Sequence, residues 1–290
     1  MASDGPDLLY HYTDGAGLRG IVTSGELWAT DALYLNDASE FVYLLGLLTE
    51  EVDTVVGSQA DASPGTVEVA RQLYRVSCIG KQLVTDDISC FVTCFCEDKD
   101  LLSQWRGYGG GMGGFSIGFK RDAIEAANEG DFRPYEFQRV HYDELGLRAQ
   151  LREHALEAFG DYGAVAEDEQ QRVAVWHELG GRFAEVTYQS LLYKHLSFAE
   201  EREWRIVTRV RRPDLTAHKL LRLRLTTLGL VPYVDLNVSG PVGRPLIGEV
   251  VIGPSLHPEL AERSVRLLLE TVGYMEGEVV VSHSRVPLRA

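Results

Sequence analysis

The chain has 290 residues and a formal net charge of -15, with 45% hydrophobic and 24% charged residues. This composition is typical of a globular protein with one large domain or two small ones. The negative charge argues against broad binding to nucleic acid or to anionic membranes, because both need a basic surface. No segment approaches the length of a membrane-spanning helix, and residues 1–7 have no signal-peptide pattern, so we expect a cytoplasmic protein with no membrane partner.

The first predicted elements place a histidine at the end of a strand. Residues 8–12 are typical of a short strand, and Thr13 or Asp14 can cap a helix that ends at Gly25. His11 would then lie beside a helix N-terminus, where phosphates and nucleotides often bind. The simpler interpretation is that His11 hydrogen-bonds a nearby carbonyl group, and the sequence leaves both open.

The rest of the chain mixes strands and helices without regular alternation, which favours an α+β fold. The patterns predict helices at 41–56, 67–76 and 99–108, a further helix after the Gly-Pro turn at 253–254, and a mostly helical segment at 143–192. Strands are predicted at 26–30, 87–98, 115–119, 135–143, 201–210, 221–225, 231–236, 248–252 and 278–288.

Three of the four cysteines lie close together in "SCFVTCFC". Alternation along a strand puts Cys90, Cys94 and Cys96 on one face, with Phe91 and Phe95 on the other. Their spacing is not that of a zinc finger, so we expect buried free thiols, also at Cys78, and no metal site. A cysteine hydrolase that uses Cys94 or Cys96 is a lower-ranked alternative, since no nucleophile elbow surrounds them.

Two other segments carry groups that suit a ligand or a reaction. If residues 201–208 form one strand, Glu201, Glu203 and Arg205 share a face, either as a catalytic carboxylate pair or as solvated ion-pair partners. In "SQWRGYGGGMGG", Trp105, Arg106 and Tyr108 precede a glycine-rich loop that matches neither a Walker loop nor a dinucleotide fingerprint. These side chains suit a base or nicotinamide ring and a phosphate, or else form a core tryptophan with a surface arginine.

Taken together, these segments resemble a known family. "YHYTDGAGLRGIVTSGELWAT", "LNDASEF", "CFCEDKDLLSQWRGYGGG", "FAEEREWRIV" and "VVVSHSRVPLR" resemble the bacterial family of proteins of unknown function numbered 2971. That family is in turn similar to the ADP-ribosyltransferase fold. The order of parts carries the second resemblance: His11 on the first strand, Thr93 on a middle strand, and Glu203 on a late strand in a Glu-x-Glu spacing. The chain lacks a Ser-Thr-Ser run, and Cys94 and Cys96 occupy nearby positions.

The resemblance implies one domain over 1–290, with a split mixed β-sheet of ADP-ribosyltransferase type and the helical insertion at 143–192. It also implies NAD as substrate, Glu203 as the carboxylate that faces the developing ribose cation, and Glu201 as general base. The implied NAD-binding residues are His11, Tyr12, Thr13, Thr93, Trp105, Arg106 and Tyr108.

The expected reaction is ADP-ribosyl transfer to an unknown protein, nucleic acid or small molecule. The alternatives are an NAD glycohydrolase and an inactive nucleotide-binding module. Toxin, phage-defence and metabolic roles all fit such an enzyme.

Overall fold

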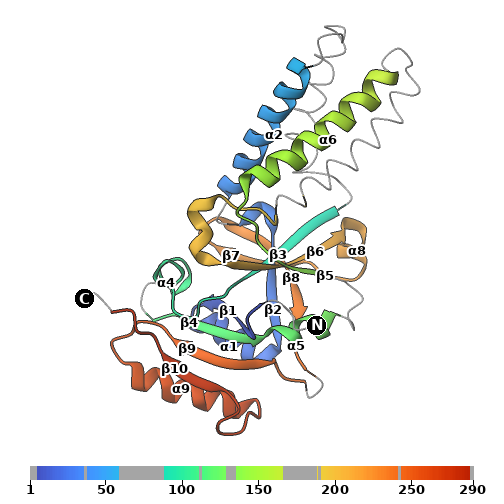
Figure 1. Cartoon of the computed structure of the whole chain (residues 1–290). Coiled ribbons are helices and arrows are strands. Elements are labelled where there is room, and N and C mark those ends of the chain that lie inside the picture. The colour runs from blue at the N-terminus through green and yellow to red at the C-terminus, as the bar shows by residue number, and fades with distance from the viewer. Residues whose placement is uncertain are drawn as a thin grey trace. The chain divides into compact units, whose positions relative to one another are not determined.

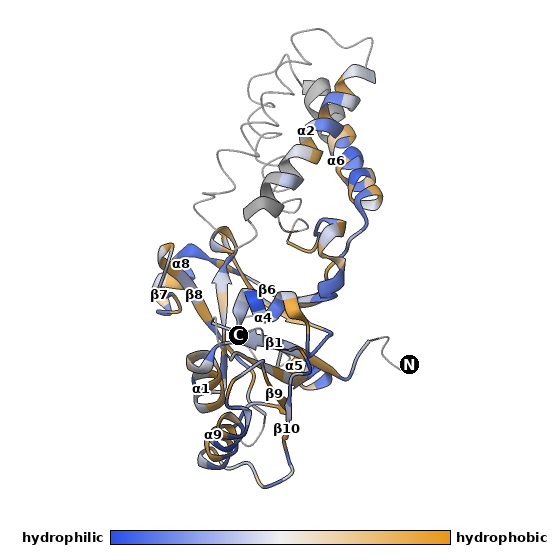
Figure 2. Cartoon of the chain, turned by 90° about the vertical axis from the view of Figure 1, so that its left-hand side faces the viewer, coloured by the Kyte–Doolittle hydropathy of each residue, from blue (hydrophilic) through white to orange (hydrophobic). Residues whose placement is uncertain are grey.

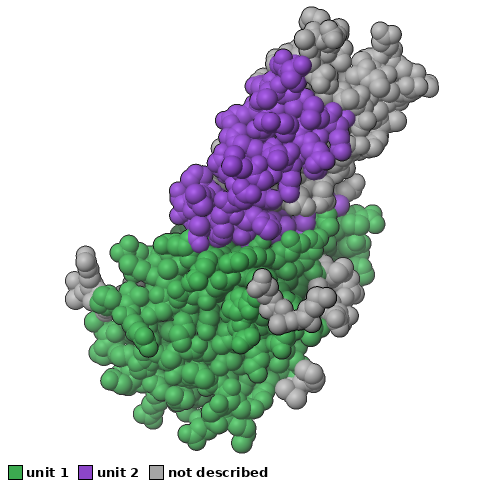
Figure 3. Space-filling model, viewed as in Figure 1, with its two compact units in different colours: residues 1–31, 90–139, 200–290 green, residues 32–89, 140–199 purple. Residues whose placement is uncertain are grey.

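The computed structural model of the chain describes residues 5–35, 38–58, 88–110, 113–128, 135–165, 188, 191–240 and 243–287. The chain divides into two compact units, coloured separately in Figure 3. Unit 1 comprises residues 1–31, 90–139 and 200–290, and unit 2 comprises residues 32–89 and 140–199. The insertion expected at 143–192 therefore falls in unit 2, which also takes residues 32–89.

Unit 1 is an α+β unit built on an open, mixed sheet (Figure 1). Its strands are β1 (Leu8–Thr13), β2 (Glu26–Asp31), β3 (Ile88–Cys96), β4 (Phe115–Lys120), β5 (Tyr135–Arg139), β6 (Glu203–Arg211), β7 (Arg222–Thr226), β8 (Gly229–Asn237), β9 (Ile247–Ile252) and β10 (Val280–His283). Its helices are α1 (Gly15–Ser24), α4 (Leu102–Tyr108), α5 (Arg121–Asn128), α8 (Arg212–Ala217) and α9 (Pro258–Thr271).

The sheet has a branch point at β3. Its main path runs β10-β9-β4-β1-β3-β2-β8-β7, and β6 pairs with both β3 and β5. β10 is parallel to β9, whereas the other pairs with a defined register are antiparallel. A strand has only two edges, so two of the three partners of β3 must share one edge. β1 pairs with β3 at Cys96, and β2 pairs at Phe91 and Val92.

The N-terminal elements follow the sequence pattern closely. Helix α1 begins after Asp14, whose side chain accepts a hydrogen bond from Gly17 N at 2.8 Å. It ends at Gly25, whose φ of 72° is the left-handed conformation that glycine adopts without strain. Leu18, Ile21 and Val22 are its buried residues, and their i, i+3, i+4 spacing puts them on one face of the helix.

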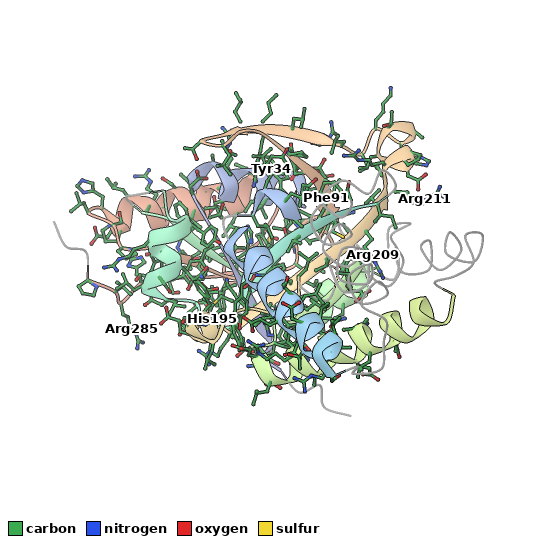
Figure 4. All side chains as sticks on the ribbon, turned by 90° about the horizontal axis from the view of Figure 1, so that it is seen from above. Tyr34, Phe91, His195, Arg209, Arg211 and Arg285 are labelled. Carbon is green, nitrogen blue, oxygen red and sulfur yellow. The ribbon has the colours of Figure 1, made fainter. Side chains whose placement is uncertain are left out.

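The main core of unit 1 joins the sheet to α1 and α9. It is built from apolar side chains of several strands and of these two helices, including Leu9, Phe91, Phe95, Ile117, Trp204, Ile206, Val250, Val265 and Leu269. Figure 2 shows both hydrophilic and hydrophobic residues along α9, as expected for a helix with one buried face. Phe91 is fully buried, whereas Arg209, in the second half of β6, is exposed; both are labelled in Figure 4.

Unit 2 contains η1 (Ala32–Tyr34), α2 (Ala38–Ser58), α6 (Glu144–Val165) and most of η3 (Leu196–Glu201). Helices α2 and α6 pack together, and the buried Glu51 of α2 accepts hydrogen bonds from Arg148 (3.2 Å) and Arg152 (2.7 Å) of α6. Helix α6 confirms the first half of the predicted helical segment. Residues 166–187 and the predicted helix at 67–76 lie outside the described residues. None of the helices searched is long and apolar enough to cross a membrane.

Candidate functional site

His11 lies near the C-terminal end of β1, and one of its ring nitrogens is already bonded. Its Nδ1 is 2.9 Å from the carbonyl oxygen of Cys94, as the simpler interpretation of the sequence expected. The ring also makes an edge contact with Phe95, with 5.9 Å between ring centroids. Because a carbonyl oxygen only accepts, Nδ1 must carry the proton. In the neutral ring, Nε2 is then a hydrogen-bond acceptor.

The surroundings of His11 favour this neutral form. Burial lowers the pKa of His11, the hydrogen bond to Cys94 acts in the opposite direction, and the positive charge of Arg224 lowers the pKa further. No described residue is a hydrogen-bond partner of Nε2. With respect to the described residues, His11 therefore offers one unused acceptor at neutral pH.

Tyr12 and Trp105 lie on the other face of β1, which corrects the expectation that they share a site with His11. Side chains alternate along a strand, so Tyr10 and Tyr12 point away from the face of Leu9 and His11. Tyr12 packs against Trp105 with ring centroids 4.7 Å apart, and both belong to a second buried cluster. Trp105 is only 6% exposed, so it takes the core role that the sequence left open.

The polar atoms of this second cluster are bonded within the protein. Tyr12 Oη donates to the carbonyl of Asp98 at 2.7 Å, and Trp105 Nε1 donates to Asp100 Oδ1 at 2.8 Å. Asp100 also accepts from the main chain of Arg285, a residue labelled in Figure 4. Burial raises the pKa of Tyr12, so its hydroxyl stays protonated. This face of β1 is a structural interior.

The remaining predicted ligand residues occupy different surroundings. Thr93 is buried, and its hydroxyl donates to the carbonyl of Trp28 at 2.7 Å, so it is not displayed to a ligand. Thr13 is half-buried at the end of β1, where it pairs with Phe115. Arg106 and Tyr108 are exposed on the last turn of α4.

The structure also corrects the Glu201–Glu203 pair. Glu201 ends the 3-10 helix η3, and Arg202 has a φ of 41°, so the chain turns before β6 begins at Glu203. The two carboxylates are therefore not alternate residues of one strand. Glu203 is 5% exposed, and Arg205 donates to both of its oxygens at 2.7 and 3.0 Å.

The three cysteines among the described residues are free, and two of them have strongly perturbed thiols. Burial raises the pKa of Cys90 to about 11 and that of Cys96 to about 12. A protonated thiol is a poor nucleophile, so neither is activated for catalysis. Within the described part of the chain, no group of acidic, histidine and cysteine side chains could hold a metal ion, and Cys78 lies beyond that part.

Sequence reasoning missed a cluster of one cationic and two aromatic side chains, formed by Arg224, Trp28 and Tyr233. Arg224 of β7 has its guanidinium carbon 5.5 Å from the ring centroid of Trp28 and 6.0 Å from that of Tyr233. The available signal was the alternation of Arg222 and Arg224 in "LRLRL", which places both on one face of a strand.

Comparison with known proteins gives one match. The model of a family described as "Protein of unknown function (DUF2971)" matches residues 104–206, which run from α4 into β6. This match supports the family that the sequence motifs indicated. No curated protein and no solved structure matches the chain.

Proposed function

We propose that the chain binds NAD at His11 and transfers its ADP-ribose group to an acceptor. The observation that carries the proposal is the state of His11, a neutral ring at the end of the first strand with Nδ1 fixed on Cys94 and Nε2 left as an acceptor. A ribose hydroxyl is a suitable donor to that nitrogen. The position of His11 is the one that the resemblance to ADP-ribosyltransferases assigns to the ribose contact.

The proposed reaction breaks the bond between C1′ of the ribose and the nicotinamide nitrogen. The bonding electron pair leaves with nicotinamide, which becomes neutral, and positive charge develops on the ribose. A fixed carboxylate lowers the energy of that transition state. Glu203 is the proposed carboxylate, and its two bonds to Arg205 fix its position. The acceptor then forms a bond to C1′ and loses its proton to a base, for which Glu201 is proposed.

One observation favours a second candidate, a nucleotide-binding module without catalysis. Both oxygens of Glu203 are bonded to Arg205, and the side chain is almost fully buried. A carboxylate in this setting also fits a purely structural ion pair, since a buried carboxylate requires a partner. Under this alternative, NAD binds and no nicotinamide is released.

The decisive experiment is incubation of the purified chain with NAD labelled in its adenylate part, with and without cell extract. We expect nicotinamide release, and label on a macromolecule or small acceptor when extract is present. Free ADP-ribose as the product without extract would indicate the glycohydrolase reaction. Binding of NAD without release of nicotinamide would support only the nucleotide-binding module. The absence of both NAD binding and nicotinamide release would reject the proposal.

Glu203→Gln tests the role of the carboxylate, since it keeps the size of the side chain and removes its charge. We expect nicotinamide release to fall by about 10²–10³, as for removal of one preorganised electrostatic contact. The matched control is Glu262→Gln, which removes a partly exposed carboxylate that is also paired with an arginine, Arg266, on α9. Equal release by both variants would contradict a catalytic role for Glu203.

A further inference from the structure

Three adjacent strands of unit 1 bring an arginine and two aromatic rings together. β8 pairs with β2 on one side and with β7 on the other, and Tyr233 of β8 lies opposite Thr30 of β2 and opposite Arg222 of β7. Arg224 lies two residues further along β7, on the same face. The rings of Trp28 and Tyr233 are 4.7 Å apart between centroids, and the Arg224 guanidinium lies near both.

Few groups in the described part of the protein balance the charge or bind the N–H groups of Arg224. Its Nη2 donates to Thr30 Oγ1 at 2.8 Å, and its Nε is buried without a hydrogen-bond partner. No carboxylate of the described residues forms an ion pair with it, although acidic residues outnumber basic ones by 43 to 28 in the sequence. Its neighbour Arg222, by contrast, is paired with Asp235 at 3.2 Å.

Such an arginine is suited to an anionic ligand. A partly buried charge without a counter-ion carries a desolvation cost that a bound anion offsets. The planar fork of a guanidinium matches the oxygens of a phosphate, and it stacks on aromatic rings while it binds. Burial lowers the pKa of Arg224, which reflects the same unbalanced charge. Trp28 is 46% exposed, so its ring is available to a planar group.

We propose that Arg224, Trp28 and Tyr233 form a binding site for a nucleotide, with a phosphate on the guanidinium and the base stacked on Trp28. Stacking of a base on an aromatic ring is largely independent of the identity of the base, because every base has a π-face. The inference does not rest on the transfer reaction, because binding alone is claimed. A free mononucleotide and the adenylate half of NAD share this chemistry.

The test is a titration of the full chain with AMP, adenosine, inorganic pyrophosphate and NAD, followed by calorimetry. We expect saturable binding of AMP, with adenosine and pyrophosphate each at least tenfold weaker because each lacks one of the two groups. NAD that binds more tightly than AMP would identify the site as part of an NAD site, and equal affinities would indicate a mononucleotide site. No saturable binding of AMP or NAD at millimolar concentration would overturn the proposal.

Matched variants locate the binding on the protein. Arg224→Ala removes a charge-assisted contact, so we expect a loss of about 10- to 100-fold in AMP affinity. Arg222→Ala removes the same charge from the same face of β7, and we expect a change below about threefold because its charge is already paired. Arg224→Lys keeps the charge but not the planar fork, so its loss of AMP affinity should lie between those of the two alanine variants. Equal effects of Arg224→Ala and Arg222→Ala would contradict a specific site.

The readouts of this test are separate from those of the proposed function. Loss of AMP binding in Arg224→Ala with unchanged thermal stability supports the site whether or not nicotinamide is released. Nicotinamide release without AMP binding would reject the Arg224 site and leave the transfer proposal standing.

Discussion

The two faces of strand β1 differ in how completely their polar groups are used. On one face, Tyr10 donates to Glu249 at 2.9 Å, Tyr12 donates to Asp98, and Trp105 donates to Asp100. On the other, His11 has one ring nitrogen bonded to Cys94 and the other without a partner among the described residues. Buried polar groups are nearly always satisfied in folded proteins. Tyr10, Tyr12 and Trp105 therefore have a structural role, whereas His11 keeps one nitrogen with capacity to bind.

The two tryptophans extend this comparison with the largest expected effect, because Trp105 is buried and bonded whereas Trp28 is 46% exposed. Trp105→Ala should lower the free energy of unfolding by about 3–5 kcal/mol, because it removes a large buried ring and its bond to Asp100. Trp28→Ala should cost less than about 1 kcal/mol, because that ring is half exposed. Urea unfolding of both variants measures the contrast. Similar losses of stability would show that Trp28 also serves mainly as core.

Glu249 tests the face of β1 that carries Tyr10 and Tyr12, and its expected effect on stability is of intermediate size. Glu249→Gln should cost about 1.5–3 kcal/mol at pH 7, because it weakens a buried acceptor that is bonded to Lys99 (2.8 Å), Ser282 (2.7 Å) and Tyr10. The matched control is Glu262→Gln on α9, where the side chain is 30% exposed, and this change should cost a few tenths of a kcal/mol.

The same carboxylate makes the free energy of unfolding depend on pH. Burial alone would raise the pKa of Glu249, but the hydrogen bonds from Lys99, Ser282 and Tyr10 outweigh burial and lower the pKa below 4.5. The unfolded chain therefore binds this proton first, and the stabilisation from Glu249 is present above about pH 4.5 and lost as pH falls through the lowered pKa. The stability gap between parent and Glu249→Gln should shrink over that range. A constant gap would contradict this assignment.

His11 gives the smallest effect, on the other face. Its pKa is lowered in the folded state, so the unfolded chain binds its proton first as pH falls below about 6.5. The free energy of unfolding should then decrease as pH falls from 6.5 through the lowered pKa. His11→Asn keeps a donor for the Cys94 carbonyl and removes the titration, so its stability should change less over the same range. A direct NMR titration of His11 with a pKa at or above 6.5 would reject the neutral-ring argument.

The sequence predicted secondary structure better than it predicted which residues contact one another. The cap at Asp14 and the left-handed Gly25 made the bounds of α1 readable, because both signals are local. The start of β6 was misplaced because the left-handed Arg202 separates Glu201 from the strand, and an arginine gives no sign of that conformation. Which residues meet across the sheet depends on register, and register is not visible within a single strand.

The candidate site shows the same limit. Alternation along the strand already places His11 and Tyr12 on opposite faces. The sequence does not show which of these faces packs against α4. Arg222 and Arg224 are equivalent in "LRLRL", and only the pairing of β7 with β8 gives Asp235 to one of them.

The two segments of unit 2 leave and re-enter unit 1 between strands that are neighbours in the sheet. Asp31 of β2 pairs with Phe91 of β3, and Arg139 of β5 pairs with Trp204 of β6. Each segment thus replaces what would otherwise be a short hairpin turn. Excision of both segments, with a tight turn at each junction, would leave the strand order of unit 1 unchanged. The strand order of unit 1 therefore does not depend on unit 2. Unit 2 consists of two insertions, each placed between two paired strands of unit 1.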